Sequence, residues 1–98
     1  MAIRLLDVAQ QELDEAVYND RLPGLGDQFL LEALAAFERI KKFQRAWHPY
    51  TENTRRCQTH RFPYGIIYEI LDSEILVVAV ANLHKRPGYW LDRIRPNK

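Results

Sequence analysis

The amino-acid sequence predicts an α+β fold with an N-terminal strand, an antiparallel helical hairpin and then a three-stranded antiparallel meander, all strands forming one mixed sheet. Three observations predict it. A strand-like run opens the chain, two segments up to residue 45 repeat apolar residues at helical spacing, and three short apolar runs follow residue 54. With 98 residues, we expect one domain, residues 1–98, around a single core.

The first helix follows directly after the first strand. Ala2 to Leu6 is a short apolar run that stops at Asp7, and Asp7 with Gln10 has the spacing of a capping box. We expect the helix to start there and to end near Arg21, because Leu22-Pro23-Gly24 cannot continue it.

The second helix is expected from about Gly24 to Arg45, with Pro49 beyond its end. The short loop between the helices predicts an antiparallel hairpin. One apolar stripe should face the core, widened by two aromatic residues; its members are Leu30, Ala33, Leu34, Phe37 and Ile40, with Phe29 and Phe43 beside them.

Three strands should complete the sheet. We expect them at about Thr54–Phe62, Ile66–Leu71 and Glu74–Asn82, with the Pro63-Tyr64-Gly65 cluster and Asp72-Ser73 as turns. Residues 75–81 are apolar at every position. A strand that is buried on both faces lies inside a sheet, so we place this strand centrally.

The charges are unevenly distributed along the chain. Residues 1–38 hold two basic and eight acidic residues, whereas residues 39–98 hold twelve basic and five acidic ones. Such segregation favours one basic face, and with it a phosphate-bearing or acidic protein partner. The alternative is that the charges only solvate opposite sides of the domain.

Several classes of protein are excluded or disfavoured. Cys57 is the only cysteine, so an intrachain disulfide and a cysteine-based metal framework are excluded. No apolar stretch approaches the roughly 18 residues of a membrane span, and the N-terminus lacks the features of a signal peptide. We expect a cytoplasmic protein that uses no metal and no cofactor.

Three segments carry a resemblance to a known family. They are a helix entry, Gly24 to Phe29, a strand turn, Phe62 to Ile70, and a basic and aromatic segment after the central strand, Val78 to Trp90. In this order, and with this succession of elements, the chain resembles the RelE/ParE superfamily of toxins from type II toxin–antitoxin modules, and is closer to the ParE-like members. The resemblance implies a cognate antitoxin as partner.

The superfamily implies two possible activities. RelE-like members cleave messenger RNA on the ribosome, while ParE-like members inhibit DNA gyrase, and the fold alone does not separate them. In RelE-like enzymes the strand after the turn opens with Tyr-Arg, the arginine lying at the reacting phosphate. Here the dipeptide is Tyr64-Gly65, which favours gyrase as the target.

A ribonuclease would need a base, an acid and cations at the phosphate. The candidates are His60, Arg61, His84, Arg86 and Tyr89. Each also has a structural interpretation: a strand histidine more often makes a structural hydrogen bond, and a tail tyrosine can pack on the sheet. We therefore assign no catalytic residue on the ParE-like interpretation.

The partner-binding surface is expected on the second helix, the cationic strand end and the tail. The residues are Leu30, Leu34, Phe37, Arg56, Arg61, Lys85, Arg86, Tyr89 and Trp90. For Trp90 we favour packing against the sheet. A third hypothesis remains open, in which the chain is an inactive basic domain that only pairs with its antitoxin.

Overall fold

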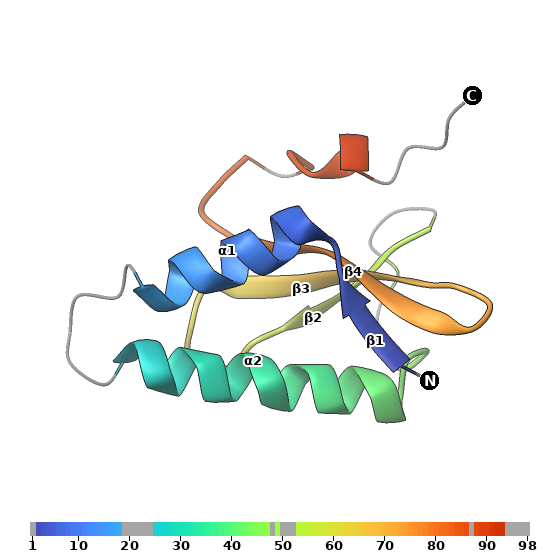
Figure 1. Cartoon of the computed structure of the whole chain (residues 1–98), viewed down its shortest axis with the longest axis horizontal. Coiled ribbons are helices and arrows are strands. Elements are labelled where there is room, and N and C mark those ends of the chain that lie inside the picture. Colours follow the sequence, from blue (N-terminus) through green and yellow to red (C-terminus); the bar gives the residue numbers. More distant parts are fainter. Residues whose placement is uncertain (1, 19–24, 48, 50–52, 87, 94–98) are drawn as a thin grey trace.

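The computed structural model describes residues 2–18, 25–47, 49, 53–86 and 88–93 (Figure 1). The predicted α+β class and the order of its elements are confirmed. The elements are β1 (Ala2–Leu5), α1 (Asp7–Tyr18), α2 (Leu25–Lys42), β2 (Arg55–Gln58), β3 (Tyr64–Ile70), β4 (Glu74–Asn82) and a short 3-10 helix, η1 (Leu91–Arg93). None of the described helices is long and apolar enough to cross a membrane.

One mixed sheet joins the strands in the order β1-β4-β3-β2. β1 runs parallel to β4, with Ala2 opposite Glu74, and β3 pairs antiparallel with both β4 and β2. A parallel pair needs a long crossover connection, and here the two helices together with β2 and β3 lie between β1 and β4 along the chain. β4 lies between β1 and β3, so the central placement of the apolar run 75–81 is confirmed.

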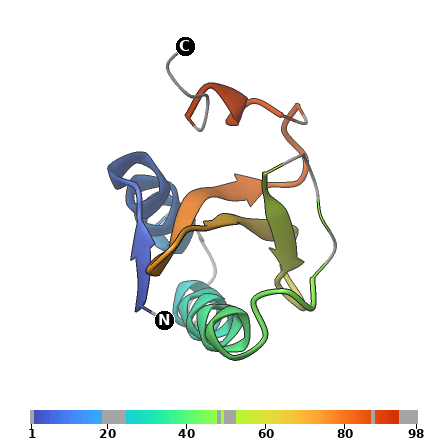
Figure 2. The same cartoon turned by 90° about the vertical axis from the view of Figure 1, so that its right-hand side faces the viewer.

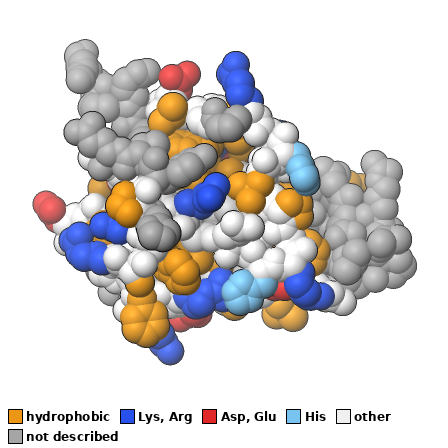
Figure 3. Space-filling model, turned by 180° about the vertical axis from the view of Figure 1, so that it is seen from behind, with side chains coloured by type: hydrophobic (Ala, Val, Ile, Leu, Met, Phe, Trp, Pro, Cys, Tyr) orange, Lys and Arg blue, Asp and Glu red, His pale blue; other side chains and the backbone are white. Residues whose placement is uncertain are grey.

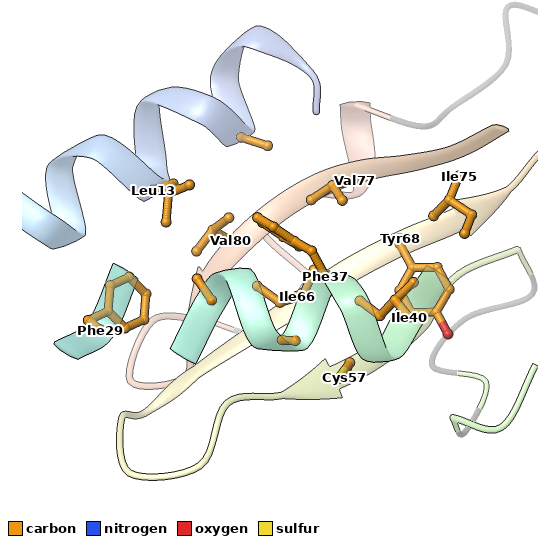
Figure 4. Close-up of a cluster of buried hydrophobic side chains, with 13 residues drawn as sticks. Leu13, Phe29, Phe37, Ile40, Cys57, Ile66, Tyr68, Ile75, Val77 and Val80 are labelled. Atoms are coloured by element: carbon orange, nitrogen blue, oxygen red, sulfur yellow. The ribbon is translucent and has the colours of Figure 1, made fainter. Parts of the chain in front are cut away.

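The two faces of the sheet are covered differently. In Figure 2, α2 lies below the sheet, α1 lies beside its β1 edge, and the C-terminal segment, of which residues 83–86 and 88–93 are described, passes above it. The larger core fills the space between sheet and helices (Figure 4) and includes Phe29, Phe37, Ile40, Tyr68 and Val80. A smaller cluster lies on the opposite face, under the C-terminal segment; its buried members are Ile67, Val78, Ala79, Ala81 and Trp90.

An irregularity in β4 explains how this smaller cluster arises. Ile67 lies opposite Ala79 but the next residue, Tyr68, lies opposite Val77, so Val78 is an extra residue on β4. An extra residue of this kind is a β-bulge, which interrupts the strict alternation of side chains. Val78 and Ala79 therefore both belong to the cluster under the C-terminal segment.

Some predicted boundaries are wrong. α2 ends at Lys42 rather than Arg45; its last helical hydrogen bond joins the Phe43 N–H to the Arg39 carbonyl, and a turn follows. β2 covers only Arg55–Gln58. The strand stops because Thr59 folds back, its N–H and its hydroxyl both donating to the Tyr64 carbonyl (3.0 and 3.1 Å).

The turn after β2 is also shifted. Tyr64 and Gly65 are already part of β3, so the chain turns over residues 59–63. The expected end of the first helix near Arg21 lies outside the described residues, as do parts of the loop before β2.

The apolar stripe of α2 is rotated relative to the prediction. Phe29, Ala33, Ala36, Phe37 and Ile40 are the residues buried against the sheet. The leucines of the predicted stripe lie at or beyond its border: Leu30 is half-buried, and Leu34 is 46% exposed. Phe43 is 60% exposed because it follows the last residue of the helix.

Candidate functional site

A carboxylate on α1 holds the C-terminal segment in place. Glu12 accepts hydrogen bonds from the Val80 N–H (3.0 Å) and from the Tyr89 hydroxyl (2.8 Å). It also forms a bidentate pair with the Arg93 guanidinium, at 3.0 and 2.9 Å. The side chains of Glu12 and Arg93 are only 16% and 18% exposed, so this pair is largely removed from water.

The position of this pair follows from the length of β1. Among the described residues, the last backbone hydrogen bond along that edge runs from the Leu6 N–H to the Val77 carbonyl, and none of them forms a partner strand for β4 beyond it. Buried backbone groups need partners. Arg93 donates to the Val78 carbonyl (3.0 Å) and Glu12 accepts from the Val80 N–H, so the two side chains replace a strand at this edge.

The aromatic residues of the segment pack inward. Trp90 is 2% exposed and covers the smaller core cluster, which confirms its expected packing role. Two cations approach the Tyr89 ring: the Lys85 ammonium lies 5.5 Å and the Arg93 guanidinium 5.3 Å from its centroid. Burial, together with the hydrogen bond to Glu12, raises the pKa of Tyr89 well above its usual range.

A basic cavity separates this segment from the end of the sheet. It has a volume of about 110 Å³, and three cations, Arg56, Lys85 and Arg86, contribute to its lining. Tyr89 and Trp90 also line it. Figure 3 shows the rear of the molecule, where the Lys and Arg side chains predominate over Asp and Glu, in agreement with the basic second half of the sequence.

Gly65 lies under one wall of this cavity. A Cβ at Gly65 would lie 3.1 Å from both Cγ and Cδ of Arg56. The aliphatic part of Arg56 therefore covers the position at which RelE-like enzymes carry an arginine. A Cβ at position 65 would require the Arg56 side chain to move by a few tenths of an ångström, so a side chain there and the stem of Arg56 compete for the same space.

Two of the predicted site residues lie beside α2 instead. Arg61 donates to Glu32 through its backbone N–H (3.2 Å) and its Nε (2.8 Å), and to Gln28 through Nη1 (3.1 Å). His60 lines a small cavity of about 80 Å³ together with Glu32 and Arg39 of α2.

The ribonuclease candidates therefore fall into two groups. His60 and Arg61 contact α2, whereas Arg86 and Tyr89 line the basic cavity under the C-terminal segment. His84 is exposed, and its backbone N–H donates to the Asn82 side chain (2.9 Å). The hydroxyl of Tyr89 is already engaged with Glu12.

The residues of the expected partner surface on α2 differ in exposure. Phe37 is only 7% exposed and belongs to the core, so it is not available to a partner. The same holds for Trp90. Leu34 is exposed, and the structure adds Leu31, which is 66% exposed and which the sequence analysis missed. The spacing of Leu31 and Leu34 on one side of the helix was the signal that could have found it.

Comparisons with known proteins bear on the family and the fold of this chain. A family profile described as "ParE toxin of type II toxin-antitoxin system, parDE" matches residues 3–86. Among solved structures, a chain of the "Chromosomal ParDE TA system from P. aeruginosa" superposes with a TM-score of 0.63 at 16% sequence identity. The match covers 85% of this chain and 96% of that one. The comparison with curated proteins found no match.

Proposed function

The chain belongs to the ParE toxin family of type II toxin–antitoxin systems, and on this premise we propose that it arrests growth by inhibiting DNA gyrase in the cytoplasm. It is the toxin component of such a module, and its partner is an antitoxin.

The observation that supports gyrase over messenger RNA is the environment of Gly65. Position 65 carries no cation, and the stem of Arg56 fills the adjacent space. Tyr89, the candidate proton donor that lines the basic cavity, has a pKa raised by burial and donates its hydrogen bond to Glu12. General acid catalysis requires a proton that can leave near neutral pH. Inhibition of gyrase by binding requires no proton transfer.

We assign gyrase binding to the exposed cations beside the basic cavity. Lys85 and Arg86 are exposed, and Leu91 in η1 is 45% exposed. Basic residues around an apolar anchor suit a protein surface that carries acidic groups. Deleting the segment is a poor test, because it would uncover the apolar cluster under Trp90.

Surface substitutions give a sharper test with purified DNA gyrase and relaxed plasmid. The unmodified toxin should block supercoiling and accumulate cleaved plasmid. The double variant Lys85→Glu/Arg86→Glu should lose this effect while keeping its melting temperature. His60→Ala serves as the control and should remain fully inhibitory. Loss of inhibition in His60→Ala, with message cut in ribosome assays, would contradict the gyrase proposal.

We assign antitoxin binding to Leu34, one of the exposed leucines of α2, and to the cations at the two ends of the β2 region. Leu34 is 46% exposed, with half-buried Leu30 beside it, and Arg61 has a side chain that is 61% exposed. Arg56 lies on the other face of the sheet, by the basic cavity. One antitoxin segment would have to pass around the β2 edge to reach both.

The two cations should therefore be reversed one at a time. Arg61→Glu and Arg56→Glu are each expected to weaken the complex mainly through slower association at low salt, because rim charges chiefly set the association rate. Surface plasmon resonance with the cognate antitoxin measures the association and dissociation rates. Unchanged association for both variants at low salt would remove the electrostatic part of this proposal.

The basic cavity also favours one alternative, cleavage of messenger RNA, because three cations can hold a phosphate. This alternative predicts codon-specific cuts in ribosome-bound message that disappear in Arg56→Met. If both gyrase and ribosome assays are negative while the antitoxin binds tightly, the chain is the inactive antitoxin-binding domain of the third hypothesis.

A further inference from the structure

The outward face of α2 combines exposed leucines with charges of opposite sign at its two ends. In Figure 2, α2 is seen nearly end-on with the sheet on one side, and no described element lies on the other side. Leu31 and Leu34 are 66% and 46% exposed there. Asp27 precedes them in the first turn, and Lys41 and Lys42 follow in the last turn.

The spacing of these residues is symmetric about Leu34. Asp27 lies seven residues before Leu34, and Lys41 lies seven residues after it. Seven residues are close to two helical turns, so all three side chains lie on one face. At about 1.5 Å per residue, each charge lies about 10 Å along the helix from Leu34.

A face with this arrangement is complementary to itself. When two copies meet antiparallel, with a two-fold axis at Leu34, Asp27 of each copy lies opposite the lysines of the other. A two-fold interface uses the same surface on both copies, and this layout meets that requirement. The leucines of both copies then cover each other near the axis, where each alone is exposed to water.

We propose that, without antitoxin, the toxin forms a two-fold homodimer through the outward face of α2. The partner is a second copy of this chain, because all of the matching groups are present in one sequence. The helix offers only about 27 Å of length over its 18 residues. The buried area therefore falls in the small class typical of weak complexes, below about 1,200 Å² in total.

The charge pairs determine the orientation more than the strength of the dimer. Glu38 already contacts Lys41 on its own helix, at 3.7 Å with both side chains exposed. Exposed ion pairs contribute little individually, so the leucines supply most of the attraction. Lys42, next along the helix and exposed, can still face Asp27 of the second copy.

The dimer and the proposed antitoxin complex should exclude each other. This consequence rests on the proposed antitoxin site, since both use Leu34. The dimer itself does not rest on that site, and it can be measured with the toxin alone.

Sedimentation equilibrium of the antitoxin-free chain over a wide concentration range is the test. The unmodified protein should associate reversibly to a dimer, and Leu34→Ser should weaken it by roughly tenfold or more, since an apolar side chain at the axis is lost twice. Lys85→Glu, on the other side of the sheet, is the matched control and should dimerise normally.

Charge reversal distinguishes this geometry from unspecific association of leucines. Asp27→Lys alone and Lys41→Glu/Lys42→Glu alone should each dimerise weakly. An equimolar mixture of these two variants should recover the original affinity, because both ends of the mixed pair regain opposite charges. A monomer at all concentrations, or no recovery in the mixture, would overturn the proposal. Either result would leave the gyrase assay unaffected.

Discussion

Replacing Glu12 with alanine should loosen the whole C-terminal segment. The substitution removes the acceptor of four hydrogen bonds, from Val80, from Tyr89 and twice from Arg93. It leaves a guanidinium that is 18% exposed without its carboxylate. Removing one partner of a buried ion pair costs about 3–5 kcal/mol. Since Arg93 can partly turn toward water, we expect the free energy of unfolding to fall by an amount at the lower end of this range, about 3 kcal/mol.

The loss should appear as a lower melting temperature. For a domain of about this size, 1 kcal/mol corresponds to roughly 4–8 °C, so Glu12→Ala should melt about 12–24 °C lower in calorimetry. Glu15→Ala is the matched control, because Glu15 is an exposed acid on the same helix. The control should change the free energy of unfolding by less than about 0.5 kcal/mol.

A double-mutant cycle tests the reason for the loss. Arg93→Met alone also breaks the pair, but the combined Glu12→Ala/Arg93→Met variant leaves no unpaired charge. Its loss should therefore be smaller than the sum of the two single losses by about 1–3 kcal/mol. Strict additivity, or a Glu12→Ala protein as stable as Glu15→Ala, would refute the role given to this pair.

Three further outcomes are expected. Val78→Asp places an unpaired carboxylate at a fully buried position in β4. This costs several kcal/mol, so the domain should unfold. A soluble variant that melts cooperatively would contradict the packing described. Tyr68 is buried and donates to the Gln44 carbonyl (2.6 Å), and burial raises its pKa from 10.0 to about 12. Because the Tyr68 hydroxyl ionises at lower pH in the unfolded chain than in the folded one, the free energy of unfolding should fall as the pH rises from about 10 toward 12. In alkaline denaturation, the Tyr68→Phe variant should lack this part of the pH-dependent loss. Cys57 is fully buried, and burial raises the pKa of its thiol. A thiol reagent should therefore label Cys57 only as fast as the protein unfolds. Labelling of the native protein within seconds would instead show an opening near β2.

The fold could be predicted because the sequence signals were local. The apolar run 75–81 indicated a strand buried on both faces, and Asp7 with Gln10 indicated the helix start. Both are confirmed by β4 and α1. Boundaries were less predictable, since the end of β2 depends on how Thr59 hydrogen-bonds to residues beyond the turn.

The candidate site depended on contacts that no local pattern reveals. Glu12 and Arg93 are 81 positions apart, and their pairing follows from where β1 ends along β4. The solvent side of α2 was also mistaken, because a stripe defined by spacing alone cannot distinguish Leu34 from Ala36 as the residue facing the sheet. Ala36 is fully buried and Leu34 is not.

The parallel pairing of β1 with β4 has a consequence for synthesis. The ribosome makes β1 first, but its partner strand, with Glu74 opposite Ala2, leaves the ribosome much later. Until then the nascent chain has its helices but no central strand on which to pack them, and non-local pairing of this kind slows folding. We therefore expect the nascent chain to acquire its toxic fold only after β4 has left the ribosome.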